Sequence, residues 1–184
     1  MRQPTYNEQI TMKNEIKLRE LCVELPDFCK EFFRGIEPTT SSRTRIAYAY
    51  DLNCFFDYLH ENNPLCTKKD ITEIPLSVLG NLAPMDIEEY LSYLKYYEKD
   101  GVEHTNDERG LKRKLASLRS FYRYLYKNEM IGQDPAVKVD MPKIHEKTIT
   151  RLDIDEVANL LDEVESGESL TEKQQKFHEK TKTR

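Results

Sequence analysis

The chain has 184 residues, of which 38 % are hydrophobic and 33 % are charged, so one domain, or one domain plus part of another, is expected. No stretch approaches the roughly 20 apolar residues of a membrane span, and the N-terminus has no apolar run typical of a secretory signal. The four cysteines form no Cys-x-x-Cys pair and the four histidines do not cluster, so neither a zinc site nor a disulfide framework is expected. No metal or cofactor is therefore assigned, and a cytoplasmic location is expected.

Charge is distributed unevenly along the chain. The formal net charge is −5, but residues 101–151 hold 11 basic and 7 acidic side chains, while the segments before and after them are net acidic. Nucleic-acid recognition depends on a local basic face rather than on the total charge, so the acidic total is only weak evidence against it. We expect any polyanionic partner to bind at this basic block.

Two helices are predicted in the first 40 residues. Apolar side chains at helical spacing indicate a helix over residues 13–25, and Pro26 suits the first position of the next helix. Gly35 can end that second helix, because glycine is favoured just beyond a helix C-terminus. Residues 1–40 are interpreted as an N-terminal helical extension.

The remaining periodicity predicts an all-α fold, a helical bundle of four main helices. The first main helix lies in the N-terminal region, and the other three are expected over residues 42–60, 84–100 and 107–128. Residues 62–83 are interpreted as a connection with about one turn of helix, and a polar loop is expected after Gly101. Asn106 can cap the helix that follows this loop.

Beyond this bundle the chain is predicted to be extended. A residue before proline avoids the helical region, which makes residues 142–152 a linker. Asp153 then caps a short helix over residues 154–164, and the tail after Ser166 is polar.

The predicted helix over residues 107–128 carries a basic sector. With about 100° per residue, its apolar stripe from Leu111 to Leu125 lies within about 40° of one direction, and the basic side chains lie between about 80° and 160°. The sector consists of Arg109, Lys112, Arg119, Arg123 and Lys127, with Arg113 just past its edge.

This basic sector has two interpretations. A solvated face is the usual role of a charged helix surface. However, seven basic residues from Arg109 to Lys127 have no acidic residue among them, whereas a solvated face usually mixes signs through i,i+4 pairs. A helix of this kind fits the major groove of DNA, where arginine bonds guanine edges and lysine neutralises phosphates.

A second candidate contact is the start of the helix over residues 42–60. Ser42, Arg43, Thr44 and Arg45 combine free helix amides, hydroxyls and two cations, which suits a backbone phosphate. A Ser/Thr cap with incidental arginines is an equally good interpretation.

Several segments resemble the tyrosine recombinases. Residues 44–59 look like the T-x₃-Y-x₂-D-L…F…L helix of that family, and residues 114–125 look like its later DNA-binding helix. Residues 152–161 resemble the L-x-x-E-E-V-x-x-L-L opening of the family's catalytic domain. The resemblance is to Xer-like and phage-integrase-like enzymes and covers roughly residues 41–165.

The resemblance implies a SAM-like core-binding domain over residues 41–141 that grips duplex DNA, followed by the linker and by the start of a catalytic domain over residues 153–184. The implied partners are double-stranded DNA and other recombinase protomers in a synaptic complex, with no membrane. The implied DNA contacts are Ser42–Arg45, Lys112, Arg113, Arg119 and Arg123, together with Lys143 in the linker.

The residues that carry the family's chemistry have no counterpart in this sequence. The family's nucleophilic tyrosine and its arginine and lysine partners lie downstream of the helix that begins here at Asp153, and no tyrosine follows Tyr126. No catalytic residue is assigned, and we expect an N-terminal fragment or a truncated product that is inactive alone. The alternative function is a helical protein-interaction module whose basic face docks an acidic partner.

This chain should therefore form no covalent adduct with DNA. A nicked suicide substrate, which traps a phosphotyrosyl intermediate, should yield only free protein on a denaturing gel, because no nucleophile with cationic partners is present. A trapped adduct would contradict this expectation.

Overall fold

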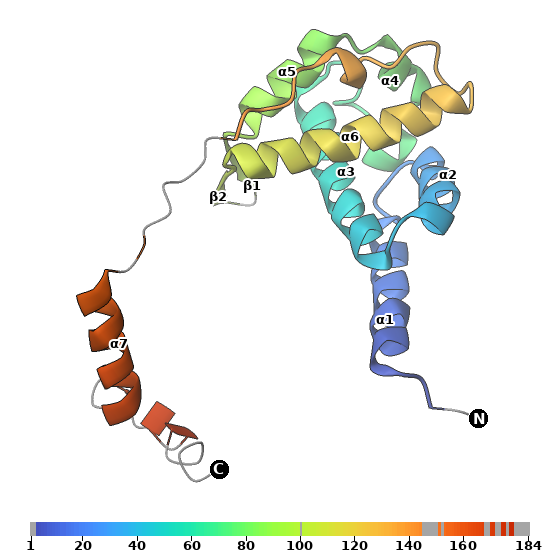
Figure 1. Ribbon diagram of the computed structural model, residues 1–184. Helices are drawn as coiled ribbons and strands as arrows, with labels where there is room; N and C mark the ends of the chain where they lie inside the picture. Colours follow the sequence, from blue (N-terminus) through green and yellow to red (C-terminus); the bar gives the residue numbers. More distant parts are fainter. Residues whose placement is uncertain are drawn as a thin grey trace. The chain divides into compact units, whose positions relative to one another are not determined.

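The computed structural model describes residues 3–99, 101–144, 151, 153–167, 170–171, 174–175 and 177–178. It divides into two units, residues 1–144 and residues 145–184, which are described separately. The first unit contains helices α1 to α6 and a two-stranded sheet, and the second contains α7 (Figure 1). Within the described residues, no helix is both long enough and apolar enough to span a membrane.

Two helices precede the centre of the first unit, α1 (Tyr6–Leu21) and α2 (Asp27–Ile36). α1 begins with a capping box, in which the side chains of Thr5 and Glu8 each accept a hydrogen bond from the other residue's backbone amide. A short 3₁₀ turn, η1 (Glu37–Thr39), connects α2 to the next helix.

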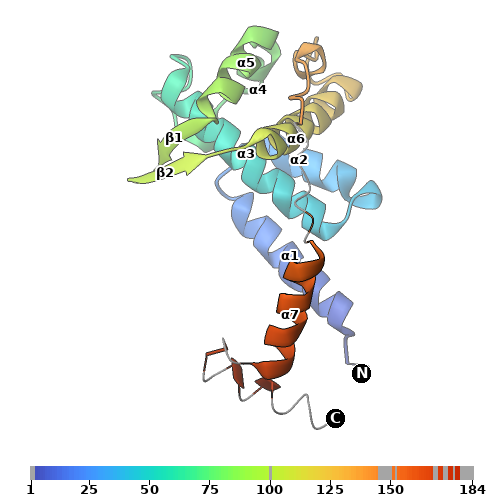
Figure 2. The same ribbon diagram turned by 60° about the vertical axis from the view of Figure 1, so that its left-hand side comes forward.

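The two long helices, α3 (Ser42–Asn62) and α6 (Glu108–Lys127), pack against each other at the centre of the unit (Figure 2). Each begins at a side-chain cap, because Ser41 accepts the amide of Thr44 and Asp107 accepts the amide of Gly110. α1 also packs along α3, so α3 is the element that joins the N-terminal helices to α6.

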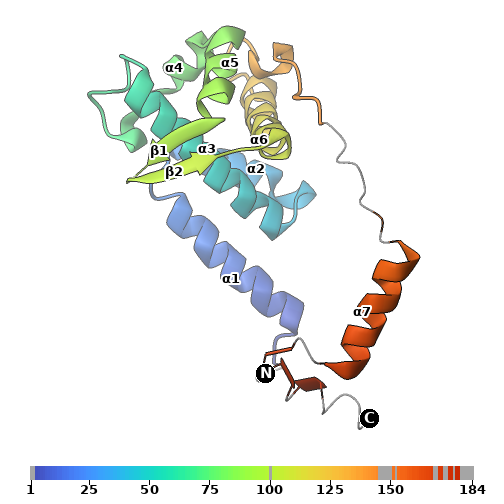
Figure 3. The same ribbon diagram turned by 90° about the vertical axis from the view of Figure 1, so that its left-hand side faces the viewer.

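Short elements connect α3 to α6. They are η2 (Ile71–Glu73), α4 (Leu76–Asn81), α5 (Pro84–Tyr93), β1 (Tyr96–Lys99) and β2 (Val102–Thr105). The two strands form an antiparallel hairpin, in which Tyr96 pairs with Thr105 and Lys99 with Val102 (Figure 3). Gly101 has a φ of +75°, a left-handed conformation that glycine adopts without a Cβ clash.

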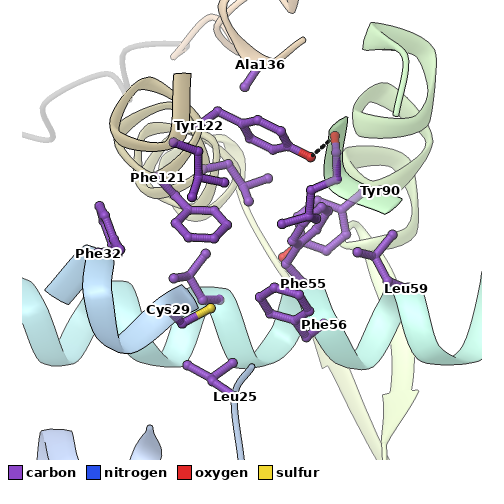
Figure 4. Close-up of a cluster of buried hydrophobic side chains, with 14 of the residues drawn as sticks. Leu25, Cys29, Phe32, Phe55, Phe56, Leu59, Tyr90, Phe121, Tyr122 and Ala136 are labelled. Carbon is purple, nitrogen blue, oxygen red and sulfur yellow. Dashed lines mark hydrogen bonds between the residues drawn. The ribbon is translucent and has the colours of Figure 1, made fainter. Parts of the chain in front are cut away.

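The core takes buried side chains from each of the helices α1 to α6. Figure 4 shows part of it, where Phe56 of α3, Tyr90 of α5 and Phe121 of α6 point towards one another. Phe121 of α6 packs against the rings of Phe28, Phe32 and Phe56. The distances between ring centroids are 6.3, 5.1 and 6.4 Å, respectively. Because Phe28 and Phe32 belong to α2, the N-terminal helices contribute to the same compact unit as α3 and α6.

The chain returns along α6 after that helix ends. The 3₁₀ turn η3 (Ala136–Lys138) packs on α5 and α6, and Ala136 and Val139 are buried. We call residues 134–141 the return segment. It brings the chain from the C-terminal end of α6 back towards its N-terminal end (Figure 1).

The second unit contains α7 (Ile154–Ser166). Asp153 and Glu156 form a capping box at its start, as the sequence predicts for Asp153, and Gly167 ends the helix with a φ of +70°. Most of the predicted linker over residues 142–152 lies outside the described residues.

The all-α prediction is confirmed, but several local expectations are wrong. The first helix begins at Tyr6, because the capping box at Thr5 fixes its start. Residues 62–83 contain α4, whose Val78 and Leu79 are buried, in addition to a 3₁₀ turn. The expected polar loop after Gly101 is strand β2, and the cap of α6 is Asp107 rather than Asn106.

Phe32→Ala should test whether α2 is part of this fold. Removing a fully buried ring at the centre of the core should lower the free energy of unfolding by about 3–5 kcal/mol. Tyr6→Ala is the matched control, because Tyr6 is 76 % exposed, and it should change stability by less than about 0.5 kcal/mol. Urea unfolding followed by circular dichroism would measure both, and equal effects would contradict the packing described above.

Candidate nucleic-acid interface

Packing fixes which face of α6 is turned to solvent. The predicted stripe is confirmed, since Leu111, Leu115, Leu118, Tyr122 and Leu125 are all buried. Lys114, Ser117 and Phe121 are buried as well, which widens the covered face on the side of α3. Most of the basic sector is therefore on the side of α6 that is turned away from the core.

Four cations of the basic sector are exposed, namely Arg109, Lys112, Arg123 and Lys127. None of their side chains has a hydrogen bond or ion pair with another described residue. At 1.5 Å per residue they extend along about 27 Å of helix. The half-buried Ala116 and Ser120 lie between them, and these short side chains leave the middle of the face open to close approach. We call these four cations, with Ala116 and Ser120, the basic face.

Asp51 of α3 borders one edge of the basic face. Its carboxylate, 1 % exposed, accepts hydrogen bonds from Arg113 Nη1 and Ser117 Oγ, both at 2.6 Å, and lies 3.4 Å from Lys114 Nζ. The Arg113 side chain is 49 % exposed, so the same guanidinium touches both Asp51 and solvent. Arg113 thus lies at the edge of the basic face, where Asp51 binds one of its guanidinium nitrogens.

Arg119 borders the other edge. Its Nε donates to the carbonyl oxygen of Ala136 at 3.1 Å, and its Nη2 donates to the carbonyl oxygen of Val139. The side chain is half-buried under the return segment. This arginine, expected from the sequence to contact DNA, therefore has an intramolecular role, because its donors hold the chain that follows α6.

The start of α3 has one exposed arginine and two hydroxyl groups that already have hydrogen-bond partners. Arg43 is exposed, whereas Ser42 and Thr44 are half-buried. The Ser42 hydroxyl accepts a hydrogen bond from Asn14 Nδ2 at 2.9 Å, and the Thr44 hydroxyl lies 2.8 Å from that of Ser41. Of these three residues, Arg43 is the best placed to reach a ligand.

Arg45 is not placed at the surface that the sequence suggests. Its side chain is 7 % exposed, with Nη2 at 2.6 Å from Glu15 and Nη1 at 3.5 Å from Glu37. The burial and the two carboxylates make Arg45 a cross-link between α1, η1 and α3. It is therefore left out of the interface proposed below. Lys143, the remaining predicted contact, is exposed.

Acidic side chains gather on another side of α3. Glu24, Asp57 and Glu61 line a cavity of about 240 Å³. Lys99 also lines it and forms an ion pair with Asp57, so these four side chains together remain net acidic. On α3, Asp57 is six residues from Asp51, so the two side chains point about 120° apart around the helix axis. The unit thus separates its charges, which explains how an acidic chain presents a basic face.

The sequence alone does not identify three of the groups that shape this site, namely Asp51, Lys114 and Ser117. A signal does exist in the sequence, since Asp51 stands beside the apolar stripe of its helix that includes Leu52 and Phe55. A carboxylate at such a position requires a buried partner, because an unpaired buried charge is strongly unfavourable. The partner itself is found only when α6 is seen packed on α3.

The chain is similar in sequence to a known family and to several known proteins. The family model for the phage integrase N-terminal SAM-like domain matches residues 30–129. The chain is 29 % identical over 151 residues to the tyrosine recombinase XerC of Leptospira interrogans, covering 80 % of this chain and 42 % of that protein. It is 29 % identical over 163 residues to XerC of Caldanaerobacter subterraneus, covering 82 % and 44 %.

Another relative is the tyrosine recombinase XerD of Staphylococcus epidermidis, which is 28 % identical over 130 residues, covering 71 % of this chain and 38 % of that protein. The chain spans about two fifths of the length of the curated relatives that it matches. No solved structure matches it.

Arg119 and Arg123 should differ in their effect on stability. Arg119→Ala removes two charge-assisted hydrogen bonds to the return segment and should lower the free energy of unfolding by about 1–3 kcal/mol. Arg123→Ala removes an exposed side chain and should change it by less than about 0.5 kcal/mol. Thermal unfolding would measure both variants, and equal stability would show that Arg119 does not hold the return segment.

Proposed function

Because the chain belongs to the family of phage integrase N-terminal SAM-like domains, we propose that its first unit binds duplex DNA through the basic face of α6. Its role is then that of the DNA-binding part of a site-specific tyrosine recombinase. The observation that carries the proposal is the row of four exposed cations without partners among the described residues. The relatives named tyrosine recombinases support the same reading.

The dimensions of the basic face suit a major groove. The groove is about 12 Å wide and admits an α-helix, whereas the cations extend along about 27 Å of α6. Arg109 and Lys127, at the two ends, then reach phosphates on either side of the groove. Lys112 and Arg123 lie nearer the middle, where Ala116 and Ser120 allow the helix backbone to approach the bases.

The contacts divide into two kinds. Cations on phosphates supply affinity and position the helix, but they carry no sequence information. Arginine on a guanine edge discriminates between bases, and Arg123 is the residue of the basic face that we assign to this role. Arg113, at the edge of the face, is assigned to a phosphate.

Two further cations extend the proposed contact surface. Arg43, exposed in the first turn of α3, is proposed to contact a backbone phosphate, aided by the positive end of the helix dipole. Lys143, exposed where the chain leaves the first unit, is proposed as another phosphate contact. Other recombinase protomers bound to the same site are the proposed protein partners.

Lys112→Ala should change the salt dependence of DNA binding. The logarithm of the binding constant should fall linearly with the logarithm of salt concentration, with a slope of about −0.9 per phosphate neutralised. Losing Lys112 should flatten this slope by about one and weaken all sequences alike. Fluorescence anisotropy with several unrelated duplexes, begun at low salt, would measure this.

Lys17→Ala is the matched control, because it removes the same charge from an exposed site on α1, which packs on α3 rather than α6. It should leave the slope unchanged. If Lys112→Ala and Arg123→Ala both kept wild-type affinity and slope while remaining folded, the DNA-binding proposal would fail. A partner protein that binds with DNA present and is not competed away would instead favour the protein-interaction module.

A further inference from the structure

Asp51 of α3 lies at the edge of the basic face. Three side chains of α6, those of Arg113, Lys114 and Ser117, converge on its buried carboxylate. A carboxylate buried to this degree is stable only when ion pairs and hydrogen bonds replace its lost hydration. The cluster therefore has to form when α3 and α6 pack.

The charges in this cluster do not cancel. Lys114 is 10 % exposed and lies 3.4 Å from Asp51, so this buried pair is neutral as a whole. Arg113 adds a second positive charge, yet it commits only Nη1 to Asp51 and leaves half of its side chain in solvent. The surplus positive charge of the cluster is thus presented at the edge of the basic face.

We propose that Asp51 is a positioning residue that fixes the guanidinium of Arg113 to receive a phosphate of the DNA backbone. One nitrogen of the planar group is bound to Asp51, and the remaining donors are directed to the phosphate oxygens. A guanidinium can serve two acceptors in this way because its five N–H donors lie in one plane. Ser117 takes part by holding the same carboxylate oxygen as Arg113.

This inference rests on the proposed function, and it predicts that removing a negative charge lowers the affinity for DNA. Replacing a carboxylate near a DNA-binding face normally tightens binding, because the protein becomes more positive. Asp51→Asn should instead weaken binding, since Arg113 loses its fixed orientation and must be ordered when DNA binds. A change in net charge alone thus predicts tighter DNA binding by Asp51→Asn, whereas loss of the Arg113 orientation predicts weaker binding.

A double-mutant cycle with Arg113 tests the proposal. Asp51→Asn alone should weaken binding by about threefold to tenfold, and it should have no such effect when Arg113 is already alanine. Arg113→Ala should flatten the salt slope by about one. Arg113→Lys should keep the slope but bind more weakly than wild type, because an ammonium cannot serve two acceptors through one rigid plane.

Ser117→Ala keeps every charge and provides a second route if Asp51→Asn fails to fold, as judged by its thermal unfolding. It should weaken binding when Arg113 is present and leave it unchanged in the Arg113→Ala background. Tighter or unchanged binding by the folded Asp51→Asn variant, or equal losses in both backgrounds, would overturn the positioning role. Lys112→Ala and Arg123→Ala separate this outcome from a failure of the proposed function. If the basic face did not bind DNA at all, these two variants would also leave DNA affinity unchanged.

Discussion

The buried carboxylate of Asp51 determines how α6 is seated on α3. A carboxylate with 1 % exposure cannot be left without donors, and all three of its side-chain partners come from α6 within a span of five residues. Turning α6 by one residue, about 100°, would remove these donors from Asp51 and also remove Phe121 from the aromatic core. The same contact thus fixes the rotation of the helix and directs its cations to solvent.

Charge separation within the fold explains why an acidic protein can present a surface for a polyanion. The acidic side chains Glu24, Asp57 and Glu61 line a cavity on a different side of α3 from Asp51. Arg45 and Arg119, although basic, are held by intramolecular partners and contribute to packing. What a DNA duplex would meet is therefore the local surface of α6, and the net charge of −5 says little about that surface.

The sequence predicts the long helices α3 and α6 well, because their apolar spacing is regular, and it predicts the buried stripe of α6 from Leu111 to Leu125. The helix expected over residues 84–100 is too long, since α5 ends at Tyr93 and β1 follows it. It does not separate the arginines by role, since Arg119 and Arg123 fall in the same sector of a helical wheel. Only the return segment, which folds back over α6, distinguishes them. The hairpin could have been recognised from Asp100-Gly101, a pair typical of tight turns between strands. The position of Asp51 signals a buried partner, but its identity depends on tertiary packing.

If the proposal is right, DNA binds to the basic face of α6 and not to other faces of the first unit. This can be tested by titrating the isotope-labelled full chain with a duplex at low salt and following backbone amide shifts by nuclear magnetic resonance. The largest shifts should occur from Arg109 to Lys127 and at Arg43, with little change at Asp57 or Glu61, which line the cavity beside α3. Shifts centred on that cavity, or no shifts in α6 at saturating DNA, would contradict it.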